Sequence, residues 1–141
     1  MGDFAQNGFV TTLHNFGTKS VEQFEEELKT FSGYRPMELI LPSLYSELEG
    51  PSLRHIVEQI SQVDYISHVI IGLDKADKEQ FLHASHFFSK LNKPFSLLWN
   101  DGPRLRAIHN ELEDMQLAPT ELGKGRNVWY CIGLAHARGK A

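Results

Sequence analysis

The sequence has little of several features that mark particular classes of protein. It has one cysteine, Cys131, so neither an internal disulfide framework nor a zinc site built from several cysteines is expected. No apolar run approaches the ~18–20 residues that cross a bilayer, and residues 1–19 have no basic start followed by an apolar stretch. Fourteen basic and eighteen acidic residues give a net charge of −4, so no overall positive field attracts nucleic acid. We expect a cytoplasmic protein that binds neither nucleic acid nor a membrane.

The composition is that of one folded domain. Hydrophobic residues make up 41% and charged residues 23% of the 141 residues, and this length is close to the commonest domain size. Residues 1–19 carry scattered apolar side chains without a period, which predicts an irregular amino-terminal arm. The remaining residues, 20–141, are then the domain.

Short apolar segments alternate with segments of helical spacing from residue 20 onward. Three apolar segments predict buried strands, at 37–41 with Pro42 closing the strand, at 66–73 and at 95–99. Five helices are expected, beginning near Ser20, Pro51, Asp77, Pro103 and Val128, the last after a loop at 121–125. This order predicts an α/β, Rossmann-like fold of three layers, in which helices flank a mainly parallel sheet of about three strands.

Helical spacing also predicts which side chains face the core. The apolar faces are expected at Val21, Phe24, Leu28 and Phe31 in the first helix, at Leu105, Ile108, Leu112 and Met115 in the fourth, and at Val128, Trp129, Ile132 and Ala135 in the last. Cys131 adjoins the last of these faces, which favours a buried structural thiol over a nucleophile. His83 and His86 are three residues apart without a third ligand nearby, which favours solvated surface over a metal site.

Polar side chains follow each predicted strand, and ligands of open α/β sheets bind at the carboxyl ends of the strands. Ser43, Tyr45, Ser46 and Glu47 follow the first strand, Asp74, Lys75 and Asp77 the second, and Asn100, Asp101 and Arg104 the third. A loop of Gly123, Lys124, Gly125, Arg126 and Asn127 precedes the last helix. Carboxylates accept from ribose hydroxyls or base N–H groups, while Lys124, Arg126 and a helix N-terminus suit phosphate, so this mixture predicts a nucleotide site.

Some of these residues also fit purely structural roles. Asp74 and Asp77 suit a turn or a helix cap as well as a ligand contact. The Gly-Lys-Gly sequence is not a phosphate-binding Walker A loop, because Ala118 replaces its first glycine and Gly125 stands where Ser or Thr should follow Lys124.

Four segments in order resemble the amino-terminal half of GT-A glycosyltransferases, and most closely bacterial enzymes of the glucosyl-3-phosphoglycerate synthase type. They are Leu39-Ile40-Leu41-Pro42-Ser43-Leu44, Val69-Ile70-Ile71-Gly72-Leu73-Asp74, Leu98-Trp99-Asn100-Asp101-Gly102-Pro103 and Gly123-Lys124-Gly125-Arg126-Asn127-Val128-Trp129. The resemblance runs from about residue 38 to the end of the chain. It implies retaining transfer of a hexose from UDP- or GDP-hexose to a small phosphorylated acceptor such as 3-phosphoglycerate.

The resemblance also implies roles for individual residues. Pro42, Ser43, Leu44 and Glu47 would border the nucleoside, Asp74 would address the base or ribose, and Lys124 would lie near the diphosphate. In the family an Asn or Asp and a Glu directly follow the Pro-x-Leu segment, whereas Tyr45 and Ser46 stand there in this chain.

A second departure from the family concerns the metal. The intact enzymes carry an Asp-x-Asp motif for Mg²⁺ or Mn²⁺ on the next strand, and no Asp-x-Asp occurs in these 141 residues. We therefore expect a donor-binding fragment that holds no metal and is inactive alone. The missing strand would pair beside the first one, so 37–41 should be an open edge through which the chain forms an oligomer.

Two other functions compete with this interpretation. A non-catalytic nucleotide-binding or assembly module of α/β fold would use the same polar residues and bind its ligand without a metal. A small hydrolase or phosphatase is disfavoured, because the chain has no Gly-x-Ser-x-Gly sequence and no evident nucleophile with a base.

Overall fold

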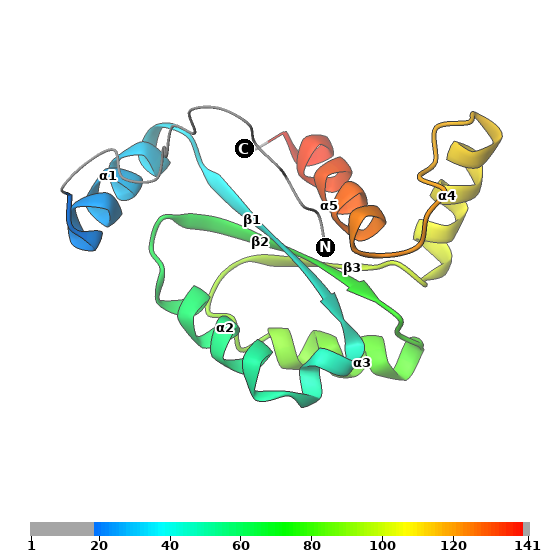
Figure 1. The fold of residues 1–141 in the computed structure, drawn as a ribbon, viewed down its shortest axis with the longest axis horizontal. Coiled ribbons are helices and arrows are strands. Elements are labelled where there is room, and N and C mark those ends of the chain that lie inside the picture. Colours follow the sequence, from blue (N-terminus) through cyan, green and yellow to red (C-terminus); the bar gives the residue numbers. More distant parts are fainter. Residues whose placement is uncertain (1–18, 140–141) are drawn as a thin grey trace, which may run out of the picture.

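The computed structural model describes residues 19–139, so the predicted amino-terminal arm lies, except for its last residue, outside the described part of the chain (Figure 1). The elements in chain order are α1 (Val21–Tyr34), β1 (Met37–Leu44), a 3₁₀ helix η1 (Tyr45–Glu49), α2 (Pro51–Gln62), β2 (Ile66–Asp74), α3 (Lys78–Phe88), β3 (Phe95–Trp99), α4 (Pro103–Asp114) and α5 (Lys124–Arg138). Among these helices none is long and apolar enough to cross a membrane.

The three strands form one parallel sheet in the order β1-β2-β3. Leu41 pairs with Ile71, and Ile71 pairs in turn with Leu97, so the carboxyl ends of all three strands lie at the same edge. This arrangement confirms the predicted α/β, Rossmann-like fold.

Helices cover both faces of the sheet, with α2 and α3 on one side and α5 on the other (Figure 1). The central strand β2 alternates between the two layers, as the period of a strand requires. Val69, Ile71 and Leu73 belong to the core formed with α2 and α3, while Gly72 lies against α5. The core is therefore built around β2, where Val69, Ile70, Ile71 and Leu73 are fully buried.

Two helices begin where local signals in the sequence predict. Ser20 with Gln23 and Asp77 with Gln80 form capping boxes at the starts of α1 and α3, as predicted. Asp77 is thus a helix cap, whereas Asp74 is the last residue of β2.

Two predicted boundaries are wrong. β1 does not end at Pro42 but continues to Leu44, because proline is tolerated in an edge strand, where a missing N–H need not break the sheet. The expected loop at 121–125 is shorter, since α5 already begins at Lys124, directly after Gly123 with its positive φ of 141°.

The predictions of buried apolar faces are also partly wrong for three helices. No residue of α1 is buried, and Val21, Phe24 and Phe31 are exposed. Only Leu105 of the expected face of α4 is buried. In α5 the buried residues are Asn127, Tyr130 and Cys131, while Trp129 and Ile132 are exposed. The inner face of α5 is therefore partly polar, which apolar periodicity does not detect.

Candidate functional site

One buried polar side chain lies at or just after the carboxyl end of each strand. Ser43 near the end of β1 is 3% exposed, and Asp74 at the end of β2 and Asn100 just after β3 are each 6% exposed. Parallel strands place these residues at one edge, as the sequence predicts. Buried polar groups are normally hydrogen-bonded, so a group without a partner at this edge indicates a place for a ligand or water.

Several polar atoms in this region have no partner among the described residues. They are Ser43 Oγ, both side-chain atoms of the Asn100 amide, and Nε of Arg126 in the first turn of α5. An unpaired buried donor or acceptor costs about 1–3 kcal/mol, so an arrangement of several is unfavourable unless a ligand or water completes it.

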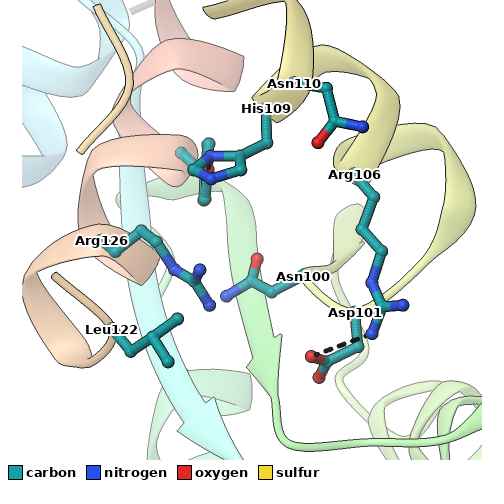
Figure 2. Close-up of a pocket in the computed structure, with 8 residues that line it drawn as sticks. Asn100, Asp101, Arg106, His109, Asn110, Leu122 and Arg126 are labelled. Carbon is teal, nitrogen blue, oxygen red and sulfur yellow. Dashed lines mark hydrogen bonds and ion pairs between the residues drawn. The ribbon is translucent and has the colours of Figure 1, made fainter. Parts of the chain in front are cut away.

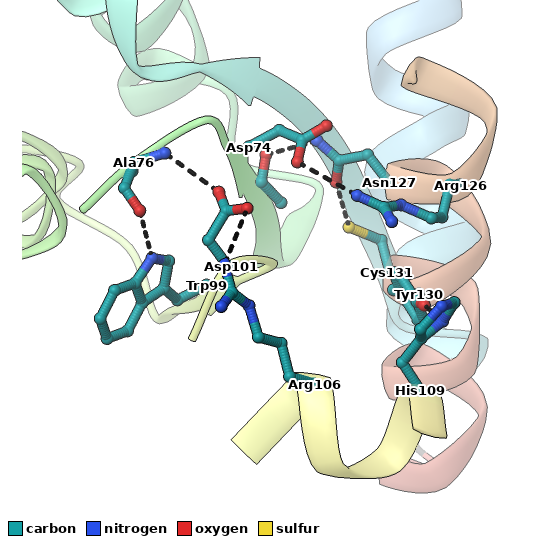
Figure 3. Close-up of polar contacts among 11 residues, drawn as sticks. Asp74, Ala76, Trp99, Asp101, Arg106, His109, Arg126, Asn127, Tyr130 and Cys131 are labelled. Carbon is teal, nitrogen blue, oxygen red and sulfur yellow. Dashed lines mark hydrogen bonds and ion pairs between the residues drawn. The ribbon is translucent and has the colours of Figure 1, made fainter. Parts of the chain in front are cut away.

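Asp74 forms an ion pair with Arg126. Nη2 of Arg126 is 3.8 Å from Oδ1 of Asp74, and the two side chains are 15% and 8% exposed. The pair joins the end of β2 to the first turn of α5, as Figure 3 shows. Asp74 is therefore a buried, charge-paired residue of the site.

The loop after β2 is fixed by Trp99, the last residue of β3, and by Asp101 just after that strand. Asp101 Oδ2 accepts from the backbone N–H of Ala76 at 3.1 Å, and Trp99 Nε1 donates to the carbonyl of Ala76 at 2.7 Å (Figure 3). Lys75, with φ of 56°, turns the chain in the left-handed region between Asp74 and this anchor. Asp101 was predicted to contact the nucleotide, and in the structure its carboxylate fixes this loop, with Arg106 3.9 Å away.

A cavity of about 340 Å³ opens beside Asn100, between α4 and α5. Figure 2 shows the side chains of Asn100 and Arg126 pointing toward one another across it. Its lining residues are Asn100, Asp101, Arg106, His109, Asn110, Leu122, Arg126 and Tyr130.

Polar contacts connect α4 and α5 at the side of the cavity. The Tyr130 hydroxyl forms a short hydrogen bond with Nδ1 of His109, and Nε2 of His109 lies 3.2 Å from Oε1 of Glu113. Burial is the main cause that raises the pKa of Tyr130, so its hydroxyl stays protonated at neutral pH.

The other predicted site residues lie outside this cavity. Lys124 and Gly123 are exposed at the start of α5, and Pro42 and Leu44 belong to β1. Glu47 is exposed and accepts from the backbone N–H of Leu44 at 2.9 Å, so it stabilises the start of η1.

Five lining residues were not predicted from the sequence: Arg106, His109, Asn110, Leu122 and Tyr130. The first three have helical spacing and share one side of α4, which is a signal that the sequence does contain. Leu122 and Tyr130 carry no comparable signal.

The polar side chains of Ser43, Asp74, Asn100, Asp101 and Arg126 at this edge of the sheet are called the rim below. Its two carboxylates do not fit the Mg²⁺ or Mn²⁺ that the resemblance implies. Asp74 is paired with Arg126, and Asp101 with the loop and Arg106. Residues 19–139 contain no group of three or more His, Cys, Asp or Glu side chains that could hold a metal ion. Such ions are held by several oxygen ligands at once, so no step is assigned to a metal here.

Comparison with known proteins gives two relatives of the chain. It is 41% identical over 133 residues to glucosyl-3-phosphoglycerate synthase of Persephonella marina, and 34% identical over 134 residues to the protein of that name from Methanococcoides burtonii. Each match covers 94% of this chain and 33% of the relative, so the chain spans about a third of the length of these relatives. No protein-family model and no solved structure matches it. The resemblance to enzymes of the glucosyl-3-phosphoglycerate synthase type is thereby confirmed over nearly all of the chain.

Proposed function

We propose that the chain is the donor-binding part of a GT-A glycosyltransferase. The intact enzyme would transfer a hexose from UDP- or GDP-hexose to a small phosphorylated acceptor such as 3-phosphoglycerate. The names of the two relatives support this substrate class, and the position of the polar rim at the carboxyl edge of a parallel sheet supports nucleotide binding.

One observation carries the proposal. Ser43, Asn100 and Arg126 bring buried polar atoms that have no partner within the described part of the chain to the same edge of the sheet, although each such atom is unfavourable in the free protein. A polar ligand that donates to some of these atoms and accepts from others would remove this cost. A nucleotide has hydroxyl, base and phosphate groups of both kinds.

The start of α5 suits the diphosphate. Gly123 caps the helix without a side-chain hydrogen bond, which leaves the N–H groups of the first turn open to an anion. Lys124 adds an exposed positive charge at the same point. In this proposal the residues of the chain bind and orient the donor, and we expect no hexose transfer by the chain alone.

A non-catalytic nucleotide-binding or assembly module is the second candidate. It would bind its ligand without a metal, in keeping with the cationic partners of Asp74 and Asp101. The two candidates share the rim, so they differ in whether the sugar of a nucleotide conjugate improves binding.

Calorimetric titration tests the proposal. The chain is titrated with UDP, GDP and ADP and with their glucose or mannose conjugates, with and without Mg²⁺. We expect one nucleotide to bind with a Kd of ~1 mM or lower, which is about −4 kcal/mol, and Lys124→Ala to weaken it severalfold. Lys93→Ala is the matched control, because Lys93 precedes β3 at the opposite edge of the sheet.

The outcomes separate the candidates. Tighter binding of the hexose conjugate than of its nucleotide supports the glycosyltransferase. Equal binding of the two supports the non-catalytic module. A folded chain that binds none of these compounds contradicts both.

A further inference from the structure

We propose that Asn100 reads the hydrogen-bonding edge of the donor's nucleobase, and that the cavity between α4 and α5 holds this edge. The inference rests on the proposed function, because it assumes that a nucleotide occupies the rim. It adds a specificity-determining residue that lies beyond the first two strands.

The backbone of Asn100 is fixed before any ligand arrives. Its N–H donates to the carbonyl of Leu73 at 3.0 Å, which continues the pairing between β2 and β3 past the end of β3. The residue is 6% exposed, yet neither Oδ1 nor Nδ2 has a hydrogen-bond partner among residues 19–139. A buried carboxamide with a fixed backbone and two unpaired ends suits a ligand that pairs with both.

The chemistry of the carboxamide restricts the ligand. A phosphate only accepts hydrogen bonds, so it would pair with Nδ2 and leave Oδ1 without a donor. The edge of a nucleobase places a donor and an acceptor side by side, and Asn forms bidentate pairs with such edges. The base therefore matches the carboxamide better than the diphosphate does.

The surroundings of Asn100 suit a flat, partly apolar group. Leu122, 78% exposed, and Tyr130 supply apolar contact surface to the cavity. Arg126, opposite Asn100, has a buried Nε that no described residue pairs with, and it can donate to a base carbonyl or stack on the ring (Figure 2). A ring between Leu122 and Arg126 would meet Asn100 with its polar edge.

The test compares Asn100→Leu with Asn92→Leu in the complete chain. The first substitution keeps the volume and removes both polar ends of the carboxamide, and the second makes the same change at an exposed position before β3. Calorimetry measures the affinity of each protein for UDP, GDP, their hexose conjugates, uridine, guanosine and inorganic pyrophosphate. We expect Asn100→Leu to weaken binding of the preferred nucleotide and its nucleoside about tenfold and to leave binding of pyrophosphate unchanged. The variant protein should unfold at the same temperature as the wild type or at a higher one.

Other outcomes overturn the inference in distinguishable ways. Unchanged nucleotide affinity in Asn100→Leu means that the carboxamide holds only water. An equal loss for pyrophosphate assigns it to the phosphates, and a loss confined to the hexose conjugate assigns it to the sugar. If wild-type protein binds no nucleotide and no nucleoside, the proposed function fails together with this inference.

A measurement on the wild-type chain covers the case in which Asn100→Leu does not fold. With ¹⁵N-labelled asparagine, the side-chain NH₂ signals of Asn100 should shift on addition of the preferred nucleoside, whereas those of Asn92 should not. Unshifted Asn100 signals at saturating nucleoside overturn the inference.

Discussion

The thiol of Cys131 is enclosed where α5 packs against β2. It is fully buried, it lies 3.6 Å from Oδ1 of Asn127, and burial raises its pKa to about 11. Because only the thiolate reacts, we expect modification at pH 8 to be at least about 100-fold slower in the folded protein than in urea. Ellman's reagent measures both rates. Rapid stoichiometric reaction of the native protein would contradict the burial.

His68 makes the folded protein sensitive to acid. Burial, and then the positive charge of Arg138, lower the pKa of His68, while Glu38 acts in the opposite direction. The unfolded chain therefore binds the proton more readily, and the free energy of unfolding should fall as the pH drops through about 6.5.

The matched variant for this effect is His68→Gln. Nε2 of His68 lies 2.9 Å from Oγ of Ser96, and glutamine can keep a hydrogen bond there without titrating. Urea unfolding at pH 7 and pH 5 should show a smaller loss for His68→Gln than for the wild type. Equal losses would show that His68 does not cause the sensitivity.

For single residues, the sequence predicts roles that depend on neighbours in the chain. It does not predict which side chains come together in the folded protein. Asp77 was recognised as a possible cap and Cys131 as a buried thiol because their signals are local. That the Asn100 side chain is buried with no partner in residues 19–139, and that Arg126 pairs with Asp74, depends on how α5 packs on the sheet. No local pattern contains this information.

The contact between α5 and β2 requires a glycine. Nδ2 of Asn127 donates to the carbonyl of Gly72 at 2.8 Å, and a Cβ atom added at Gly72 would lie 1.7 Å from Oδ1 of Asn127 and 2.7 Å from Sγ of Cys131. The helix and the strand therefore pack too closely for any side chain at this position.

Gly72→Ala should consequently destabilise the fold. Moving buried atoms aside costs about 1–3 kcal/mol or more, and the hydrogen bond of Asn127 would be lost with it. Urea unfolding measures the change. Gly33→Ala is the control, since no atom lies within 4 Å of a Cβ there, and equal stability of the two variants would contradict this packing.

The secondary structure elements were predictable because their periods and caps are local. All three strands and all five helices were expected from residues 20–141, and β3 has the bounds that the sequence predicts. The apolar face of α1 was expected in the core but is exposed, because apolar spacing indicates a face without saying what covers it.

The order of the strands leaves β1 paired on one side only within the described chain. Met37–Leu44 bonds to β2, and among residues 19–139 no strand lies on its other side. Open edges promote pairing with a second chain, so the protein should form a dimer or larger oligomer. Light scattering over a range of concentrations tests this, and a monomer at high micromolar concentration would contradict it.

At the scale of the whole molecule, we expect the carboxyl edge of the sheet to bind a nucleotide. Backbone amide NMR of the ¹⁵N-labelled chain, titrated with UDP and GDP, tests this binding. Saturable shifts should occur at the ends of β1 and β2, at Asn100 and at residues 123–126, with the opposite edge around Asn92 unaffected. Shifts confined to the opposite edge, or none at millimolar nucleotide, would contradict it.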